Sequence, residues 1–190
     1  MQVSFDAGLL LWIQSNLRSD MMTPFWQLIT MLGTRGWFWI ALAVILVTIP
    51  GTRRTGMTAL LAMAVSLVVT NLLLKNLVAR VRPYEVIEGL QLLTARQPDF
   101  SFPSGHTSAA FAAALTFYRG MPRRYGRLLV LLACLIAFSR LYLGVHYPSD
   151  VLGGIAVGIL SYMAAPRLYE ALAGRLRRRK PVLEKDSSQP

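Results

Sequence analysis

Cysteine, histidine and acidic residues are all scarce in this chain of 190 residues. It has one cysteine, Cys134, two histidines and 9 Asp+Glu. A lone cysteine in an apolar stretch excludes a disulfide framework and a cysteine-based metal site. Charged residues make up only 15% of the sequence, whereas a soluble domain usually has about 25%. Because 54% of the residues are hydrophobic, the composition indicates a membrane protein with one compact unit.

The charged residues cluster and leave long uncharged stretches between them. The longest stretch, 56–74, is 19 residues without a charge, close to the roughly 20 that a helix needs to cross the hydrocarbon core. Shorter uncharged stretches occupy 21–34, 36–50, 128–139 and 151–166. A net charge of +11 would also suit nucleic acid, but a nucleic-acid-binding protein gathers its basic residues on one exposed face. We therefore predict a surrounding lipid bilayer and no nucleic-acid partner.

Most basic residues lie in the connections between apolar stretches, and this predicts an orientation. Thirteen of the 20 fall in two short connectors or near the C-terminus, and the positive-inside rule makes that side cytoplasmic. The loops 77–102 and 140–149 are then predicted to lie together on the extracytoplasmic face. Alternation predicts an all-α, polytopic membrane helix bundle with spans over residues 36–50, 56–76, 103–118, 127–143 and 150–170.

Two arrangements suit residues 1–34, which contain two apolar pieces separated by charged residues. They form an interfacial helix followed by a short sixth span, which we favour, or a shallow hairpin on the outer side. No secretory signal is visible. The main membrane domain is expected over 35–170. Residues 171–190 are expected to form a basic cytoplasmic tail against anionic lipid.

Two cations stand at the outer end of the longest apolar stretch. Lys75 closes the stretch, and Arg82 follows seven positions later, directly before Pro83. Taken alone, Lys75 is more simply explained as a residue that extends its ammonium group to the membrane interface.

The sequence Pro103-Ser104-Gly105-His106 opens the next apolar stretch. Ser104 is a favourable N-cap, and Gly105 lets a ligand approach the backbone closely. The free N–H groups and the dipole of such a helix start suit a phosphate, which His106 in the first turn would face. A single histidine at this place is better explained as a capping or core residue.

A third group lies between the last two predicted spans. Arg140 ends one apolar stretch, and Pro148 begins the next helix. Asp150 follows His146 by four residues, so it can accept a hydrogen bond from one imidazole nitrogen and direct the other outward. A carboxylate in a first turn also suits the helix dipole, which explains Asp150 but not His146.

The three groups together favour a phosphate site. The predicted topology puts both histidines of the chain on one membrane face with Lys75, Arg82 and Arg140. A bound phosphate would supply the missing negative charge. Two histidines and one carboxylate among three cations would repel a divalent metal ion, so we expect no metal and no cofactor.

These residues resemble a known family over about 75 positions. They match, without departure, the three-part signature of the type 2 phosphatidic acid phosphatases (the PAP2 family), shared with acid phosphatases and vanadium haloperoxidases. The resemblance implies a six-helix bundle in a bacterial plasma (inner) membrane, with a metal-independent site on the extracytoplasmic face. The matching strings are Lys75-x6-Arg82-Pro83, Pro103-Ser104-Gly105-His106 and Ser139-Arg140-x5-His146-x3-Asp150.

The resemblance also implies a mechanism. His146 would attack phosphorus to form a phosphohistidine, Asp150 would hold its tautomer, and His106 would act as general acid and then as general base. The implied reaction is the hydrolysis of a lipid phosphate, most simply of undecaprenyl pyrophosphate, the cell-wall carrier lipid, to undecaprenyl phosphate. The phosphate oxygens would be bound by Lys75, Arg82, Ser104, Gly105 and Arg140.

Other functions stay open at this point. A phosphatidylglycerophosphate or phosphatidic acid phosphatase is the close alternative, and a transporter of anionic lipid or phosphate is an alternative of another class. The two histidines with Asp150 argue against transport, since an anion pore has little use for a nucleophile and an acid. Residues 84–102 suit an interfacial lid and a solvated connector equally well.

Overall fold

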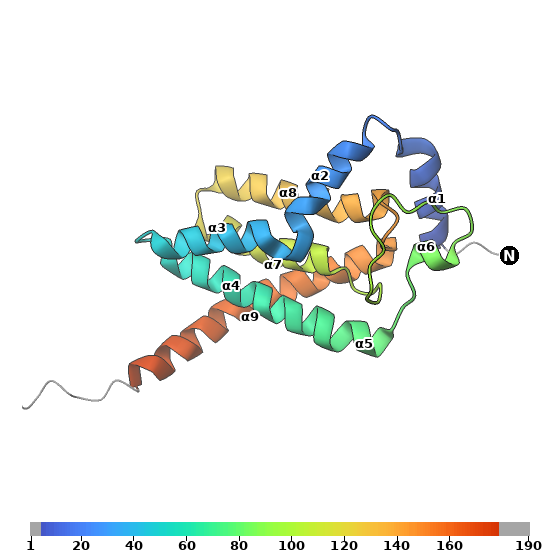
Figure 1. The fold of residues 1–190 in the computed structure, drawn as a ribbon. Helices are drawn as coiled ribbons and strands as arrows, with labels where there is room; N and C mark the ends of the chain where they lie inside the picture. Colours follow the sequence, from blue (N-terminus) through green and yellow to red (C-terminus); the bar gives the residue numbers. More distant parts are fainter. Residues whose placement is uncertain (1–4, 179–190) are drawn as a thin grey trace, which may run out of the picture.

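The computed structural model of the protein describes residues 5–178, and this part of the chain is helical without strands (Figure 1). Seven longer helices are joined by short helical segments, of which η1 is a 3-10 turn and η2 is π-helical. In chain order the elements are α1 (Phe5–Leu17), α2 (Thr23–Gly33), η1 (Thr34–Gly36), α3 (Trp37–Thr48), α4 (Arg53–Leu67), η2 (Val68–Leu74), α5 (Lys75–Val78), α6 (Pro83–Val86), α7 (Gly105–Gly120), α8 (Arg123–Tyr142) and α9 (Pro148–Arg178).

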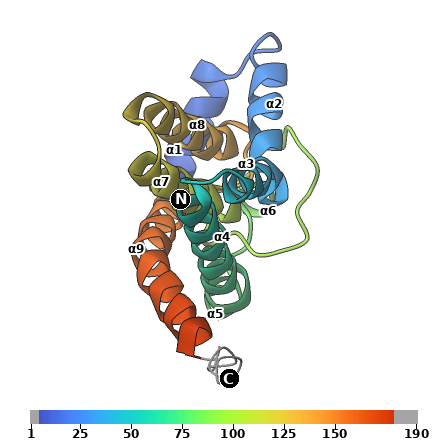
Figure 2. The same ribbon diagram turned by 90° about the vertical axis from the view of Figure 1, so that its left-hand side faces the viewer.

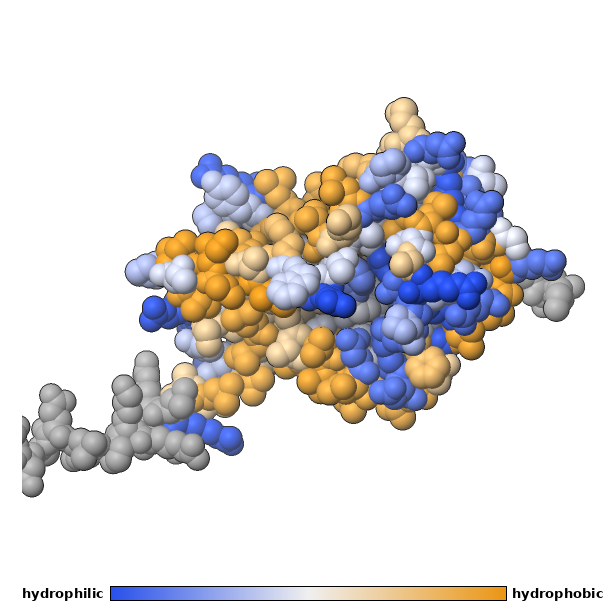
Figure 3. All heavy atoms as spheres, in the orientation of Figure 1, coloured by the Kyte–Doolittle hydropathy of each residue, from blue (hydrophilic) through white to orange (hydrophobic). Residues whose placement is uncertain are grey.

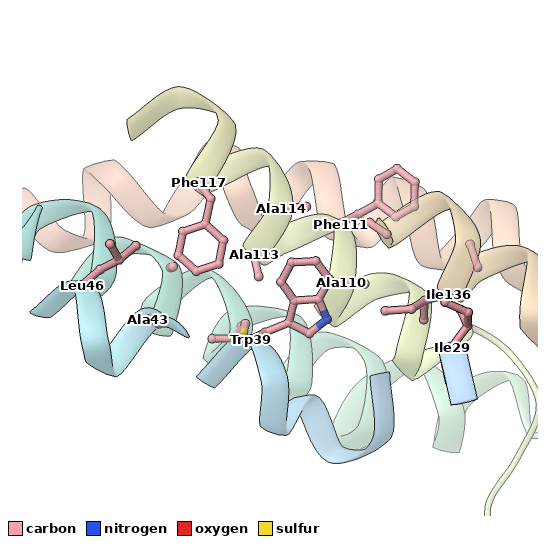
Figure 4. Packing of buried hydrophobic residues seen from close by; sticks show 14 of the residues in the cluster. Ile29, Trp39, Ala43, Leu46, Ala110, Phe111, Ala113, Ala114, Phe117 and Ile136 are labelled. Atoms are coloured by element: carbon pink, nitrogen blue, oxygen red, sulfur yellow. The ribbon is translucent and has the colours of Figure 1, made fainter. Parts of the chain in front are cut away.

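Helix α7 is the central element of the bundle. It packs against α4, α8 and α9, and α8 and α9 lie on different sides of it (Figure 2). Small residues allow this close approach, because four alanines of α7 are fully buried. Trp39 of α3 packs over them and stacks on Phe117, with 6.4 Å between ring centroids (Figure 4). The buried alanines are Ala110, Ala112, Ala113 and Ala114.

The outer surface of the bundle is apolar along most of its length. Leucines such as Leu72, Leu128 and Leu160 each expose more than 60% of their surface. Figure 3 shows this hydrophobic surface, with hydrophilic residues gathered over the end that carries α1 and α6. Four helical segments are long and apolar enough to cross a membrane, namely Thr23–Thr48, Arg53–Val86, Arg123–Tyr142 and Pro148–Arg175. The surface is therefore suited to lipid contact.

The predicted fold class is confirmed. The five predicted spans overlap α3, α4 with η2, α7, α8 and α9, but α7, with 16 residues, is not among the four segments long enough to cross a membrane, so its crossing stays a prediction. The predicted sixth crossing is not confirmed. Helix α2 does not turn back before α3, because Arg35 and Gly36 bend the chain with φ of 50° and 71° and the helix then continues. α2 and α3 therefore form one bent segment, preceded by α1 (Figure 1).

The C-terminal helix is longer than predicted. α9 continues to Arg178, so the first part of the predicted tail is helical. Residues 171–176 contain Ala, Leu and Arg, which are strong helix formers, and nothing in their pattern ends the helix at 170. The predictions for 179–190 lie outside the described residues.

Candidate active site

Three chain segments that carry the predicted site residues meet at one end of the bundle. They are the end of α5 with the following loop, the start of α7, and the connection from α8 to α9 (Figure 1). The backbone N–H of Ser104 donates to the carbonyl oxygen of Asp150 at 3.0 Å, and that of Leu93 donates to the carbonyl of Leu143 at 3.2 Å. The predicted meeting of loops 77–102 and 140–149 is therefore present.

His146 is buried and held between a carboxylate and a cation. Its Nδ1 lies 3.4 Å from Oδ2 of Asp150, and its Nε2 lies 3.5 Å from a guanidinium nitrogen of Arg82. Because a carboxylate accepts hydrogen bonds, this geometry assigns the ring proton to Nδ1 and leaves the Nε2 lone pair facing the cation. The spacing of four residues thus produces the predicted hydrogen bond.

The environment of His146 keeps its imidazole neutral. Burial and the positive charges of Arg140 and Arg82 lower the pKa of His146 to about 4, although the hydrogen bond with Asp150 acts in the opposite direction. An imidazole with this pKa is unprotonated at neutral pH. Its Nε2 can therefore act as a nucleophile without first losing a proton.

Asp150 is fully buried and receives several hydrogen bonds besides that of His146. Its Oδ2 accepts from the hydroxyl of Ser101 at 2.5 Å and from the backbone N–H of Tyr147 at 2.9 Å. A buried carboxylate is stable only when such donors surround it. Ser101 was not predicted as a site residue, since a serine in a long loop carries no signal in the sequence.

Arg80 is a second residue that the sequence analysis missed. Its guanidinium donates to Asp150 at 2.7 Å and to Asp6 of α1 at 2.8 Å, and it lies 3.7 Å over the ring of Tyr147. Arg80 therefore links α1 to the carboxylate behind His146. The sequence contained one indication of its role, because Arg80 lies in the predicted outer loop and not in the connectors that hold most of the basic residues.

Lys75 and Arg82 share one acidic partner. Both side chains are buried, and both form ion pairs with Asp99, at 2.6 Å for Arg82. Burial alone would raise the pKa of Asp99, but the hydrogen bonds and charges of Lys75 and Arg82 outweigh it and hold that pKa below its ordinary value. An ionised carboxylate therefore lies against the two cations predicted to bind phosphate.

The π-helical segment η2 directly precedes Lys75. π-helical turns are rare and often occur at functional sites, because they shift the residues that follow around the helix axis. The apolar stretch up to residue 74 gave no signal of this irregularity.

Arg140 is buried at the end of α8 with unused hydrogen-bonding capacity. One guanidinium nitrogen donates to Thr30 of α2 at 2.5 Å. Its Nε is buried and has no hydrogen-bond partner among the described residues. Because an unsatisfied buried donor is unfavourable, this atom is suited to an incoming anion.

The start of α7 has the predicted position but a different capping interaction. Ser104 is the N-cap residue, yet its hydroxyl accepts from Thr107 at 2.9 Å instead of bonding a backbone N–H. The backbone N–H of Ser104 donates to the backbone carbonyl oxygen of Asp150. Gly105 lines a cavity at this end of the bundle, and a Cβ built on it would lie 4.0 Å from the Lys75 ammonium nitrogen. Of the two predicted residues, Gly105 therefore lines the cavity, whereas Ser104 does not.

A cavity of about 480 Å³ brings most of these residues together. Its polar part contains both histidines and the cations, and its apolar part runs between α3 and α4. Asp150 stands behind His146 and does not line it. The predicted residues on the wall are Lys75, Arg82, Gly105, His106, Arg140 and His146, joined by Asp99 and Gln97. The apolar wall includes Ile40, Leu60, Met63, Ala64 and Leu67.

Residues 55–173 of the chain match the PAP2 superfamily. The chain belongs to this superfamily. It is 31% identical over 124 residues to the undecaprenyl-diphosphatase of Sulfolobus acidocaldarius, which covers 65% of this chain and 60% of that protein. The chain thus spans about three fifths of the length of that curated relative.

Two solved structures resemble most of the bundle. The crystal structure of Aquifex aeolicus LpxE has a TM-score of 0.77 and 28% identity, covering 87% of this chain and 97% of that chain. The transmembrane PAP2-type phosphatidylglycerolphosphate phosphatase of Bacillus subtilis has a TM-score of 0.68 and 26% identity, covering 88% and 85%. With its long apolar helices, this PAP2 member is a multi-pass membrane protein.

Proposed function

We propose that the protein is a lipid phosphatase that hydrolyses undecaprenyl pyrophosphate to undecaprenyl phosphate through a phosphohistidine on His146. The observation that carries the proposal is the orientation of this imidazole. Nδ1 lies against the buried Asp150, and Nε2 lies beside Arg82 in a cavity rich in cations. Membership of the PAP2 superfamily supports the same reaction class.

In the first step, Nε2 of His146 attacks the terminal phosphorus and the bond from phosphorus to the leaving oxygen breaks. Asp150 stabilises the positive charge that develops on the ring. His106 protonates the leaving oxygen from the opposite side of phosphorus. Lys75, Arg82, Arg140 and the amide of Gly105 bind the non-bridging oxygens.

In the second step, His106 accepts a proton from water, which attacks the phosphohistidine. The bond from phosphorus to nitrogen breaks, and inorganic phosphate leaves. Four cationic side chains and one carboxylate line the cavity. This charge suits a phosphate and opposes a bound divalent metal ion, so the proposed mechanism uses the side chains alone.

The apolar part of the cavity suits the lipid chain. Its wall includes Leu67 of α4, which is also exposed on the bundle surface. A substrate in the bilayer could therefore place its phosphate among the cations while its chain stays in apolar surroundings. We propose that the end of the bundle with the two histidines faces the extracytoplasmic side. The opposite end, which carries the basic connectors and is called the basic end below, faces the cytoplasm together with the C-terminus.

A phosphatidylglycerophosphate or phosphatidic acid phosphatase is the second candidate. It is favoured by the likeness to the phosphatidylglycerolphosphate phosphatase of Bacillus subtilis. The cavity has room for a larger headgroup beside the histidines, since a second cavity of about 320 Å³ also contains His106 and Arg140.

The deciding experiment is phosphate release from a panel of detergent-solubilised lipids, each measured with and without EDTA. We expect the highest kcat/KM for undecaprenyl pyrophosphate and no change on chelation. A preference for phosphatidylglycerophosphate or phosphatidic acid would replace the first candidate by the second. Loss of activity with EDTA would contradict the metal-independent mechanism.

A further inference from the structure

One cation in the cavity has no partner within the part of the chain that the structure describes. The other basic residues at this end are engaged: Arg18 donates to Gln14 at 2.9 Å, and Arg96 lies 6.0 Å over the Tyr84 ring. Hydrogen bonds to other side chains are also made by Lys75, Arg80, Arg82 and Arg140. Within residues 5–178, the Arg35 side chain makes no hydrogen bond, ion pair or ring contact. It nevertheless lines the same cavity as the phosphate-binding cations.

Arg35 belongs to the segment that packs on His106. A Cβ built on Gly33, two residues earlier, would lie 3.0 Å from Cδ2 of the His106 ring. Because Gly33 has no side chain, the end of α2, from which η1 continues, can approach the imidazole closely. Arg35 therefore lies on the stretch of cavity wall that begins at the contact of Gly33 with His106, while Arg82, which is paired with Asp99, lies beside Nε2 of His146.

The backbone at Arg35 is unfavourable for this residue type. Its φ of 50° and ψ of 13° lie in the left-handed region, where glycine or asparagine is preferred. A strained conformation at a ligand cavity is a reason to look for a function of its side chain. An arginine in this conformation places a long cationic side chain at the cavity wall, which glycine could not do.

The direction of the reaction gives this cation a role. In an in-line displacement the leaving group departs on the side opposite the nucleophile. With His146 as nucleophile, that side is the one occupied by His106 and Arg35. A lipid monophosphate releases a neutral alcohol there, whereas a lipid diphosphate releases a phosphate that carries negative charge.

We propose that Arg35 binds the phosphate group that stays on the lipid when a diphosphate is cleaved, which makes it a residue that selects diphosphate over monophosphate substrates. This inference rests on the proposed function. In the step concerned, a bond forms between Nε2 of His146 and the terminal phosphorus, and the bond to the bridging oxygen breaks. The electron pair stays on that oxygen, His106 protonates it, and Arg35 pairs with the remaining charge.

The test uses two substrates that differ by one phosphate. Hydrolysis of geranylgeranyl diphosphate and of geranylgeranyl monophosphate in the same detergent is measured for the wild type, Arg35→Gln and Arg35→Lys. The matched control is Arg96→Gln, which removes another exposed arginine at the same end without touching the cavity wall. Binding of methylenediphosphonate and of inorganic phosphate is measured in parallel by calorimetry.

We expect Arg35→Gln to lower kcat/KM for the diphosphate about tenfold, the size of one charge-assisted contact. The monophosphate should change less than about twofold. Arg35→Lys should retain much of the preference, and Arg96→Gln all of it. Methylenediphosphonate should bind more weakly to Arg35→Gln, with inorganic phosphate unaffected.

Two results would overturn the subsite. Equal loss on both substrates would indicate a general effect on the fold or on His106, and wild-type rates on both substrates would show that Arg35 does not meet the second phosphate. If the wild type hydrolyses neither lipid, the proposed function fails. The calorimetric comparison still decides the subsite in that case, because it needs no turnover.

Discussion

The two ends of the bundle use the same kind of ion pair in different surroundings. At the basic end, Arg54 and Glu170 meet at 2.6 Å with about two thirds of each side chain exposed, at 65% and 64%. At the other end, Arg80 and Asp150 meet at 2.7 Å, with the carboxylate fully buried. Exposed pairs contribute about 1 kcal/mol or less, whereas losing one partner of a buried pair leaves an uncompensated charge.

This difference separates two uses of charge in a membrane protein. The basic end carries exposed arginines, whose number predicts the orientation. At the other end, buried charges are tied to one another in a series: Asp6 to Arg80, Arg80 to Asp150, and Asp150 to His146. Position matters there because each group fixes the next one, and the series ends at His146, the proposed nucleophile.

Removing the nucleophile should have the largest effect. In His146→Ala, kcat should fall by at least about 1,000-fold, because no other group can form the covalent intermediate. The phosphoenzyme trapped by acid quench after addition of labelled substrate should disappear in parallel. Labelled phosphate retained on the protein would contradict the assignment of His146.

The second largest effect should come from the buried ion pair. Arg80→Gln should lower kcat roughly 100-fold with little change in KM, because Asp150 loses the cation that fixes it while the phosphate-binding residues stay in place. Arg80→Lys should restore part of the loss.

The exposed pair supplies the control for this prediction. Arg54→Gln removes an arginine of similar geometry at the other end and should leave kcat and KM within about twofold of the wild type. If the two glutamine variants lose activity equally, the contrast between the ends is wrong.

A pair of glycines tests the same contrast through packing. In Gly33→Ala, the added Cβ would meet Ile136 at 2.8 Å and the His106 ring at 3.0 Å, so Ile136 must shift and the ring must give way slightly. We expect kcat to fall about tenfold. Gly174 in α9 has nothing within 4 Å of an added Cβ, and Gly174→Ala should leave the rate unchanged. Thermal unfolding of both variants would show whether a loss of rate reflects a loss of folding instead.

The smallest effect should be a gain in anion affinity. Asp99→Asn removes the carboxylate that competes with phosphate for Lys75 and Arg82, so sulfate should inhibit the variant several-fold more strongly at pH 7. Because the pKa of Asp99 lies below its ordinary value, the wild type keeps this carboxylate ionised until acidic pH. As the pH falls through that pKa, the wild type should approach the variant.

Sulfate is suited to this titration because it keeps both charges down to a much lower pH than phosphate does. The comparison is made as the ratio of the two inhibition constants at each pH. A ratio that stays constant from neutral to acidic pH would show that Asp99 does not compete with the anion.

Several parts of the site follow directly from the order of residues. Charge clusters alternate with apolar stretches, and this alternation is enough to bring residues 75–82, 103–106 and 139–150 to one end. The bond from His146 to Asp150 follows from their spacing, because four residues across a helix start keep the two side chains adjacent. The meeting of both histidines with Lys75, Arg82 and Arg140 is the consequence.

Contacts between distant segments depended on the tertiary structure. Asp99 lies 24 positions from Lys75, and Asp6 lies 74 from Arg80. No local pattern encodes such pairs, since they depend on how the loop folds back and on where α1 docks. The same holds for Gly33 and His106, whose contact requires the bend at Arg35 between α2 and α3.

The sequence by itself therefore determined the membrane class, and it predicted the residues that meet at one end of the bundle and that we propose as the reacting groups. These follow from composition, alternation and short spacings, which act along the chain. The tertiary structure alone decided which charges are paired and which are free. It tied Asp150 to Arg80, placed Asp99 on Lys75 and Arg82, and left Arg35 without a partner among residues 5–178, because burial and pairing depend on segments that meet only after folding.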